Sequence, residues 1–453
     1  MVSRFRVPTA PGGLPFVGHT RRLSHDPLAY LRSLRGAGDL VRLRVGPRCV
    51  YLVTCPALTR RVLVDEARSF DKGAMFDELR LGMGNGLVIS GGAFHRRQRR
   101  LAQPAFHPAR IDGYTRAMTR RAGERTAAWQ SGVTLDLTRE LDELTLDILL
   151  DTVLGDSAGA VREDVLRWLS AKSGVMRRVL SPLSAWRARL LRPGPARPLP
   201  VTEDTLASLR ALLAVEIHRG RLAPVGGGTE DMLSVLIAAR DPDGVTGMTD
   251  AELTDELLTL FLAGTGTVSA ALAWAFAEVS RHPAMERALA DEALRVLGGP
   301  RPATVADLPE LQYTERFLRE VLRCHAVWLL MRRTLTAVEL GGVTLPPGTD
   351  VYLSPDILHH DPGSFADPDR FDPDRWLAER REPGAQGARG AYLPFGAGNR
   401  RCAGDGYAWA EMALVLATTL ARWRLVPGPG NRPRPRVGTV VRPERLRMIP
   451  EPR

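Results

Sequence analysis

The chain has 453 residues, of which 44% are hydrophobic, so it can bury a large core. Its formal net charge is +11, but the arginines are spread along the chain and aromatic residues make up only 6%, a composition that argues against the basic, aromatic-rich patches of nucleic-acid binders. The four cysteines fit a reducing, cytoplasmic compartment, because their spacing forms neither a disulfide framework nor a zinc pattern: Cys49, Cys55, Cys324 and Cys402.

Residues 1–20 are rich in proline and glycine and contain no apolar run of signal-peptide or membrane-anchor length. We therefore expect no membrane association. The next elements that the pattern predicts are a short helix from Asp26-Pro27, a strand pair between Asp39 and Thr54 around Gly46-Pro47, and a helix over Pro56–Ala67.

Residues 71–92 are glycine-rich and are expected to be irregular. They carry many apolar side chains, among them Met75, Phe76 and Leu87. A loop with so much apolar surface covers a core or lines a ligand cavity, and both alternatives are open here.

His95 and Arg99 lie four residues apart in a basic run that is expected to be helical, so they share one helix face. Such a run is usually a solvated basic face, and the alternative is a site for a buried anion. Apolar spacing near 3.6 residues predicts further helices over 109–129, 139–154, 161–173 and 202–219. Two connectors are expected at Leu191–Pro200 and Gly226–Gly228.

The longest helical pattern runs from Thr249 to Arg281 and begins with a capping box that includes Glu252. At 1.5 Å per residue it would span about 45–50 Å, and its apolar composition predicts a central buried helix. Gly264 and Gly266 lie inside it, each at a cost of about 1 kcal/mol. They indicate either close helix packing or a groove where a ligand meets the backbone, Ala263 and Thr267.

A helix predicted over Leu311–Arg323 places Glu320 and Arg323 on one face, which by itself indicates an ordinary ion pair. The apolar stretch after it includes Val327 and Leu329 and is followed by Arg332 and Arg333.

A loop of small residues from Phe395 to Gly404 precedes a predicted helix over Tyr407–Trp423. Cys402 lies near the start of this helix and next to Arg401, and both the helix dipole and the positive charge would favour its thiolate. Cys402 is therefore either a metal ligand or nucleophile, or a small buried apolar residue.

The loop resembles the haem-binding signature F-G-x-G-x-R-x-C-x-G of the cytochrome P-450 superfamily at all six fixed positions. Three further stretches resemble motifs of this superfamily in the same order. They are the His-x-x-x-Arg pair at 95–99, the oxygen-activation motif A/G-G-x-D/E-T at 263–267 and the E-x-x-R pair at 320–323, with Pro373-Asp374-Arg375-Trp376 in the place of the later P-E-R-F stretch.

The resemblance implies roles for these residues. Cys402 would bind the iron of haem b, in a loop that includes Phe395, Gly396 and Gly404. His95, Arg99, Arg400 and Arg332, or Arg333 in its place, would bind the haem propionates. Glu320, Arg323 and Arg375 would brace the cysteine loop. Thr267 and position 266 would act in oxygen activation.

The implied fold is mainly α-helical with small β-sheets, near the N-terminus and after Arg332. It forms a single haem-thiolate domain over residues 1–453, with haem between the long central helix and the helix after the cysteine loop. The protein would be a cytoplasmic monomer that uses O2 and takes electrons from a separate ferredoxin and ferredoxin reductase. An acidic ferredoxin is expected to dock at Arg96, Arg97, Arg400 and Arg401, and the alternative for some of them, Arg400 first, is that they turn inward to the propionates.

The implied activity is monooxygenation of an apolar molecule, by hydroxylation or epoxidation. The stretches PGGLPFVGH, HRRQRR and WLLMRR also resemble bacterial members that act on terpenoids, so a terpenoid is expected, in a pocket lined by Met75, Phe76, Leu87, Ala263, Val327 and Leu329. The alternatives are a macrolide, another polyketide or a fatty acid as substrate, and a haem-binding sensor or carrier or a basic interaction protein in place of an enzyme.

Gly266 departs from the motif, which has Asp or Glu at this position. Losing one member of an acid–base relay typically costs about 10²–10⁴-fold unless another group replaces it. We expect a substrate hydroxyl or water, admitted by the space at Gly266, to complete the relay with Thr267; an altered reaction is the alternative.

Overall fold

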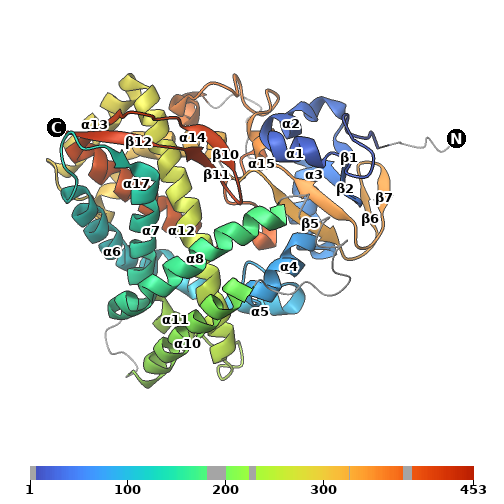
Figure 1. Ribbon diagram of the computed structural model, residues 1–453, viewed down its shortest axis with the longest axis horizontal. Coiled ribbons are helices and arrows are strands. Elements are labelled where there is room, and N and C mark those ends of the chain that lie inside the picture. The colour runs from blue at the N-terminus through green and yellow to red at the C-terminus, as the bar shows by residue number, and fades with distance from the viewer. Residues whose placement is uncertain (1–6, 181–199, 224–230, 326, 381–389) are drawn as a thin grey trace.

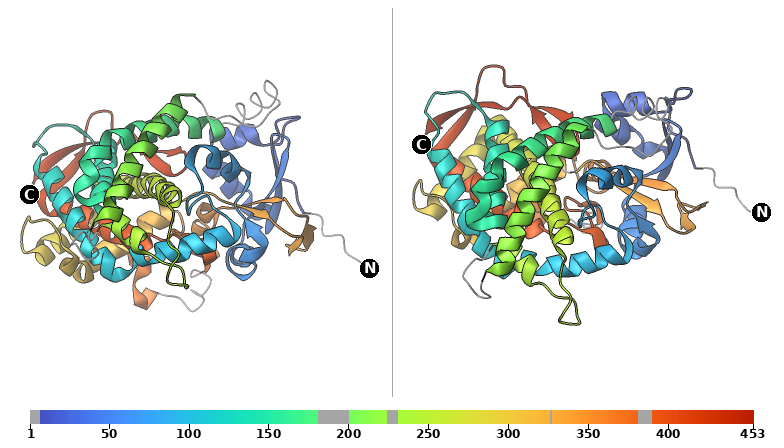
Figure 2. Two further views of the ribbon diagram at one scale, coloured as in Figure 1. Left: turned by 90° about the horizontal axis from the view of Figure 1, so that it is seen from below. Right: turned by 60° about the horizontal axis from the view of Figure 1, so that its bottom comes forward.

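The computed structural model describes residues 7–180, 200–223, 231–325, 327–380 and 390–453. Most of the two connectors expected at 191–200 and 226–228 therefore lies outside the described residues. In Figure 1 most of the long helices fill one side of the molecule, and strands from the N-terminal part and from residues 330–353 lie together on the other side, beside the short N-terminal helices. The two views of Figure 2 show the same division, with α12 (Asp250–Arg281) running through the middle of the helical part.

Helices account for most of the described chain. The α-helices are α1 (Thr20–His25), α2 (Pro27–Ser33), α3 (Pro56–Arg60), α4 (Ala74–Met83), α5 (Gly92–Ala102), α6 (Pro108–Ala127), α7 (Leu137–Leu154), α8 (Ala158–Leu180), α10 (Pro200–Leu222), α11 (Met232–Ala238), α12 (Asp250–Arg281), α13 (Pro283–Leu297), α14 (Gln312–His325), α15 (Pro355–His359) and α17 (Asp405–Arg422). A π-helical turn, η2 (Arg61–Asp65), follows α3, and the short 3₁₀ helices include η7 (Pro373–Trp376) and η9 (Gly398–Arg400).

The largest sheet joins distant parts of the chain in the order β1-β2-β8-β5-β3. Its strands β2 and β8 are parallel, with Val50 opposite Asp350, and its other neighbours are antiparallel. The strands are β1 (Leu40–Val45), β2 (Arg48–Val53), β3 (Phe70–Asp71), β4 (Leu135–Asp136), β5 (Leu330–Thr334), β6 (Val338–Leu340), β7 (Val343–Leu345), β8 (Asp350–Leu353), β9 (Trp423–Pro427), β10 (Arg434–Val437), β11 (Val441–Glu444) and β12 (Arg447–Pro452).

The structure confirms the predicted strand pair and the predicted helices in the described part of the chain, with ends shifted by a few residues. One prediction is wrong. Residues 71–92 are not irregular throughout, because α4 occupies Ala74–Met83. Its ends are glycines, Gly73 and Gly84, and Gly84 has φ of +76°, so residues that look like loop signals instead cap a short helix. The resemblance implied small sheets after Arg332, and strands β6 to β12 lie there, although the bounds of these strands were not predicted.

The helix α12 is the centre of the main hydrophobic core. Its N-terminus carries the expected capping box between Thr249 and Glu252, and Leu257, Phe261 and Trp274 on it are buried. By length and composition α12 could cross a membrane, but 67% of its most apolar window is buried inside the fold. It is therefore the core helix of a folded domain.

Candidate functional site

The cysteine loop folds tightly against the N-terminal part of the chain. The Cys402 N–H donates to the Phe395 carbonyl at 3.0 Å and closes the loop. Gly396 and Gly398 have φ near +69°, which glycine adopts without strain, and a Cβ at Gly398 would meet the carbonyl oxygen of Leu63 in η2. A Cβ at Gly396 would meet nothing within 4 Å, so there is open space beside the loop at this residue.

The Cys402 side chain is exposed, three residues before α17 begins. The protein that surrounds the sulfur nevertheless raises the pKa of its thiol through desolvation, while the Gly404 N–H and, more weakly, Arg99 and Arg401 lower it. The lowered thiol pKa that the sequence suggested is thus not produced by the polypeptide alone. A positive metal ion at the sulfur would favour the thiolate directly.

Three of the predicted charged residues meet at one buried carboxylate. Glu320 and Arg323 are completely buried, and Arg323 donates to both oxygens of Glu320 at 2.9 and 3.0 Å. Arg375 in η7 donates to the same carboxylate at 2.9 Å, and so does the indole N–H of Trp376 at 3.0 Å. Arg323 also donates to the His359 carbonyl at 2.7 Å. Both oxygens of the Glu320 carboxylate therefore have hydrogen-bond partners, as the burial of a charge requires.

His359, which the sequence analysis did not single out, connects this cluster to the cysteine loop. Its ring is fully buried; Nδ1 donates to the Arg323 carbonyl and Nε2 accepts from the Leu393 N–H, both at 2.9 Å. Burial lowers the pKa of His359 to about 3, so the ring is neutral and this tautomer satisfies both bonds. Leu393 in turn accepts from the Gly396 N–H at 3.1 Å.

A group of basic side chains from four separate segments gathers beside the cysteine loop: Lys72, His95, Arg332 and Arg400. Burial, reinforced by the positive charge of their neighbours, lowers the pKa of His95 to about 3, that of Arg332 to about 10, and that of Lys72 well below its usual value. Asp71 is the acid whose charge acts on Lys72, Arg332 and Arg400, and Arg400 donates to it at 2.9 Å. Three cations thus face one carboxylate.

The hydrogen-bond partners in the structure show which of the predicted arginines could bind an external anion. Arg333 is committed to Asp350 and Asp77, at 3.1 and 2.8 Å, whereas the guanidinium of Arg332 donates to the carbonyl of Met331. Arg332 is therefore the better candidate of the two for an external anion. Arg99 donates to the Arg401 carbonyl at 2.8 Å, so it lies along the cysteine loop.

Lys72 was missed because a single lysine after a short strand carries no sequence signal. It is one of only two lysines in the chain, and its ammonium lies 4.6 Å from the centroid of the Phe76 ring.

The two glycines in the middle of α12 have different structural reasons. A Cβ at Gly264 would lie 2.8 Å from Leu149 of α7, so this glycine permits close helix packing. At Gly266 the nearest atom to an added Cβ would be Nη2 of Arg442, at 3.2 Å. The expected open space at Gly266 is therefore wrong, because a guanidinium from β11 already occupies it. Thr267 is exposed, and its hydroxyl donates to the Ala263 carbonyl at 2.8 Å.

The residues expected around a substrate are apolar side chains of intermediate exposure: Phe76, Leu87, Ala263, Val327 and Leu329. The side chain of Met75 lies outside the described part. The Leu87 N–H donates to Glu256 of α12 at 3.1 Å, and the Asn85 N–H donates to Asp255 at 2.6 Å. These bonds fix the segment before α5 against α12, about two turns before Ala263. Leu329 instead packs against the core under β1 and β2.

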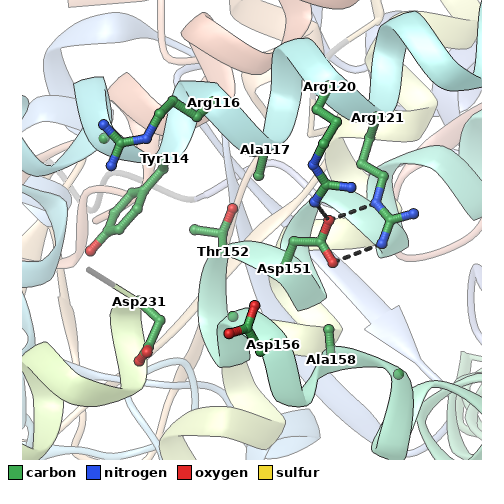
Figure 3. Close-up of a pocket in the computed structure, with 13 residues that line it drawn as sticks. Tyr114, Arg116, Ala117, Arg120, Arg121, Asp151, Thr152, Asp156, Ala158 and Asp231 are labelled. Atoms are coloured by element: carbon green, nitrogen blue, oxygen red, sulfur yellow. Dashed lines mark hydrogen bonds and ion pairs between the residues drawn. The ribbon is translucent and has the colours of Figure 1, made fainter. Parts of the chain in front are cut away.

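Two hollows open at the surface, and Arg99 is the one predicted haem-site residue among the residues that line them. The one in Figure 3, of about 720 Å³, is lined by residues of α6 and α7 and of the segments that follow α7 and precede α11. Its lining carries three arginines and three aspartates, so its charges balance, and Asp151 accepts from both Arg120 and Arg121, as the dashed lines show. It contains none of the predicted site residues. The other hollow, of about 790 Å³, lies between α5 and α6 and is lined by Arg96, Arg99, Arg100, Arg110 and Phe106, among others.

This geometry suits a large flat group with one thiolate ligand and negatively charged edges. No cluster of three or more His, Cys, Asp or Glu side chains that could hold a metal ion occurs among the described residues, so a metal near Cys402 would need a group that brings its own ligands. The two propionates of haem b would balance the excess of two positive charges around Asp71. The open space at Gly396 leaves room for a large group beside the loop. The residues present therefore fit haem.

A sequence model of the cytochrome P-450 family matches residues 8–450. The chain is 42% identical to cyclooctatin synthase of Streptomyces melanosporofaciens over 99% of this chain and 96% of that protein. It is 39% identical to cyclooctat-9-en-7-ol 5-monooxygenase of the same species, over 93% and 90% of the two chains. It is 37% identical to pentalenene oxygenase of Streptomyces avermitilis, over 98% and 97%.

Proposed function

The chain belongs to the cytochrome P-450 family of haem-thiolate monooxygenases, and from that premise we propose that Cys402 is its iron ligand and that Lys72, His95, Arg332 and Arg400 hold the haem propionates. Members of this family bind haem b through a cysteine thiolate and use O2, redox partners and hydrophobic substrates. The sensor, carrier and interaction-protein alternatives are therefore set aside. What remains to be assigned is which residues of this chain perform each step and on which substrate.

The observation that carries the assignment is the excess of buried cations beside the cysteine loop. Lys72 and Arg332 have pKa values lowered mainly by burial, so their charges are costly in the polypeptide alone. Two carboxylates placed between them would turn this cost into charge-assisted hydrogen bonds. Arg400 ties the cationic group to the loop, because its guanidinium donates to Asp71 and to the Ser90 carbonyl.

When bound, haem supplies the oxygen-activating redox chemistry of the family. The chain contributes the thiolate of Cys402, held by the buried Glu320–Arg323–Arg375 cluster and His359. Thr267 contributes a hydroxyl on the exposed face of α12. Its hydrogen bond to the Ala263 carbonyl keeps that hydroxyl in one position, from which it can hold a water molecule or pass on a proton. The whole chain, 1–453, serves as one such unit.

We further propose a terpenoid as the substrate. Two relatives with 37–39% identity are a cyclooctat-9-en-7-ol 5-monooxygenase and a pentalenene oxygenase. Phe76, Leu87, Ala263 and Val327 offer apolar, partly exposed surface to such a skeleton. Leu329 is a weaker member of the pocket, because it packs against the core under β1 and β2.

The electron donor is proposed to be an acidic ferredoxin with its reductase, and the enzyme a cytoplasmic monomer. The structure moves the expected docking surface. Arg97 donates to Asp241, Glu252 and the Gly247 carbonyl, and Arg400 is turned inward, so neither offers a free charge. Arg96 and Arg110 remain exposed beside the hollow between α5 and α6, and Arg401 is 61% exposed although paired with Asp405.

The decisive experiment compares wild type, Cys402→Ala and Cys49→Ala after haem reconstitution. We expect wild type and Cys49→Ala to show the reduced carbonyl band that gives the family its name, and Cys402→Ala to lack it. Cys49 is a matched control, because it is also exposed but lies on β2. A carbonyl band that survives in Cys402→Ala would refute the ligand assignment.

The substrate proposal is tested by spectral titration with pentalenene, cyclooctat-9-en-7-ol, a macrolide aglycone and a fatty acid. The two terpenoids are expected to displace iron-bound water at the lowest concentrations. Tighter binding of the macrolide or the fatty acid would overturn the terpenoid assignment and leave the haem assignment intact.

A further inference from the structure

Arg442 on β11 reaches α12 at the residue before Thr267. Its Nη2 donates to the carbonyl of Gly266 and to the hydroxyl of Ser269, both at 3.0 Å. The side chain is 28% exposed, so it connects solvent with a partly buried turn of the helix. Strand β11 lies far from α12 in the sequence, and no local sequence pattern predicts this contact.

Asp142 on α7 completes the arrangement. Its carboxylate accepts from Nη1 of Arg442 at 2.7 and 2.8 Å, and it also accepts from the Ser269 hydroxyl at 2.6 Å. Ser269 is 1% exposed, whereas 44% of the Asp142 side chain is exposed. Three side chains from three elements thus form a closed ring of hydrogen bonds around the Gly266 carbonyl. We call this set, Asp142, Ser269 and Arg442, the Gly266 ring.

Gly266 and the Gly266 ring depend on each other. An added Cβ at Gly266 would lie 3.2 Å from Nη2 of Arg442, which is tighter than ordinary contact, so the guanidinium would have to move. A carboxylate side chain at this position would in addition compete with Asp142 for Arg442. The chain therefore carries its acid on α7, next to the turn where the family motif carries it on α12.

The ring acts on the turn that presents Thr267. Within this turn the Ala263 carbonyl accepts from the Thr267 hydroxyl, and the Thr265 carbonyl faces the Thr145 hydroxyl of α7 at 3.4 Å. Arg442 adds a charged donor at the carbonyl of Gly266, the next residue. Side-chain donors that reach the carbonyls of a helix are among the identified causes of local opening and bending. The position of the Thr267 hydroxyl therefore depends on the ring.

We infer that Asp142, Ser269 and Arg442 are positioning residues for oxygen activation at Thr267, and that they take the place of the acid that the family motif carries at position 266. This inference rests on the proposed function, since it assumes haem chemistry at Thr267. The ring holds the turn through the Gly266 carbonyl and joins it to a water-exposed carboxylate. A substrate hydroxyl is then not required to complete the site.

The test uses the full-length, haem-loaded enzyme with ferredoxin, reductase and NADPH, with pentalenene and cyclooctat-9-en-7-ol as probes. The variants are Asp142→Asn, Arg442→Lys and Gly266→Glu, and the double variant Asp142→Asn/Gly266→Glu. The control is Asp147→Asn, because Asp147 is on the same helix and also binds two arginines, Arg125 and Arg162. The readouts are haem content, the carbonyl band, the spectral dissociation constant of the probe, product and hydrogen peroxide per NADPH, and amide hydrogen exchange of residues 261–270.

Asp142→Asn and Arg442→Lys should keep the haem content, the carbonyl band and the spectral dissociation constant. Product per NADPH should fall about 5- to 100-fold, the range that a displacement of up to about 1 Å produces, with a matching rise in peroxide. Exchange of 261–270 should become faster in both, and Asp147→Asn should match wild type in every readout. Ser269→Ala leaves the ion pair between Asp142 and Arg442 in place. It should change product per NADPH, peroxide and exchange in the same direction, but by a smaller factor.

The double variant gives the sharpest result. Gly266→Glu should lower the yield in the wild-type background, because its carboxylate competes with Asp142. In the Asp142→Asn background it should raise the yield, because it gives Arg442 a carboxylate again. Wild-type yield and exchange in all ring variants, or an equal effect of Gly266→Glu in both backgrounds, would overturn the inference. A wild-type enzyme without the carbonyl band would instead refute the proposed function.

Discussion

The Nε2 atom of His359 accepts a hydrogen bond from the backbone N–H of Leu393 at 2.9 Å. On its other side the same ring donates to the carbonyl of Arg323, which is held by Glu320. One neutral imidazole therefore connects the fully buried Glu320–Arg323 ion pair to Leu393, two residues before the cysteine loop. The loop owes its position to this connection as well as to its own glycines.

Replacing His359 by Ala should leave a buried carbonyl and a buried N–H without a partner. Each unsatisfied group costs about 1–3 kcal/mol, so we expect a loss of about 2–4 kcal/mol in the free energy of unfolding, measured with urea. Haem should also pass faster to an excess of a haem-scavenging protein. His218→Ala, at an exposed position, is the control and should change stability by less than about 0.5 kcal/mol. An unfolding curve of His359→Ala equal to that of wild type would contradict this role.

The same histidine predicts a dependence of stability on pH. Burial holds the pKa of His359 at about 3 in the folded protein, against an ordinary value of 6.5. Below pH 6.5 the unfolded chain binds a proton that the folded chain does not, so stability falls as the pH decreases from about 6 to 4, by about 1.4 kcal/mol per pH unit for this one group. His359→Asn should be less stable at pH 7 but should show a shallower slope. Equal slopes would show that His359 is not the group that titrates.

Glu256 predicts a slope of the opposite sign. Burial, mainly, raises the pKa of Glu256 to about 7, so the folded protein keeps a proton that the unfolded chain releases above about pH 4.5. Stability should therefore decrease as the pH rises from 4.5 to 7 and then level off. Glu256→Gln keeps an acceptor for the Leu87 N–H and should be about 1–3 kcal/mol more stable than wild type at pH 8, but equal to it at pH 4. Glu163→Gln, at an exposed site, is the control, and a gain that is the same at both pH values would refute the titration.

Lys72→Met should act in opposite directions on the haem-free and haem-bound protein. Without haem, removing Lys72 relieves its repulsion from Arg332 and Arg400, so the stability should be equal to or above that of wild type. With haem, the loss of a charge-assisted bond of about 1.5–3 kcal/mol should weaken haem binding about 10- to 100-fold. Arg68→Met, an exposed position nearby, serves as the control for both measurements. Unchanged haem affinity in Lys72→Met would remove Lys72 from the haem site.

Ferredoxin binding should depend on the charge of Arg96. It should not depend directly on Arg97, because the charge of Arg97 is already paired within the protein. Arg96→Glu should raise the KM for an acidic ferredoxin several-fold, and the effect should shrink as ionic strength increases, because screening shortens to about 8 Å near 0.15 M. Arg97→Glu should instead destabilise the protein, since it sets a third carboxylate against Asp241 and Glu252. Arg434→Glu, exposed on β10, is the control for the change in net charge. A KM that is independent of salt and of Arg96 would exclude this surface.

The sequence predicted most helices because their apolar periodicity is long and regular, and it predicted the roles of Cys402 and Glu320 through short motifs. It could not predict His359, Lys72 or Arg442 in the same way. Each of these residues lies close to a partner more than 30 residues away in the sequence. The residue type alone does not indicate which partner that is. Gly266 was recognised as a departure from the motif, but which atom fills its space is a property of the packed strand β11. The helix α4 was missed because its two flanking glycines look the same as loop glycines.

The largest sheet and the cationic group beside the cysteine loop share one property: each combines residues from the first quarter of the chain with residues from its last third. Strand β8, the partner of β2, is synthesised about 300 residues after it. Arg332 and Arg400 are likewise synthesised long after Lys72 and His95. At a synthesis rate of about 5–20 residues per second, the early strands spend roughly 15–60 s on the ribosome without their partners. On the proposed assignment, haem can bind only after Arg332, Arg400 and Cys402 have been made, and a truncated product without the final 60 or so residues would lack both Arg400 and Cys402.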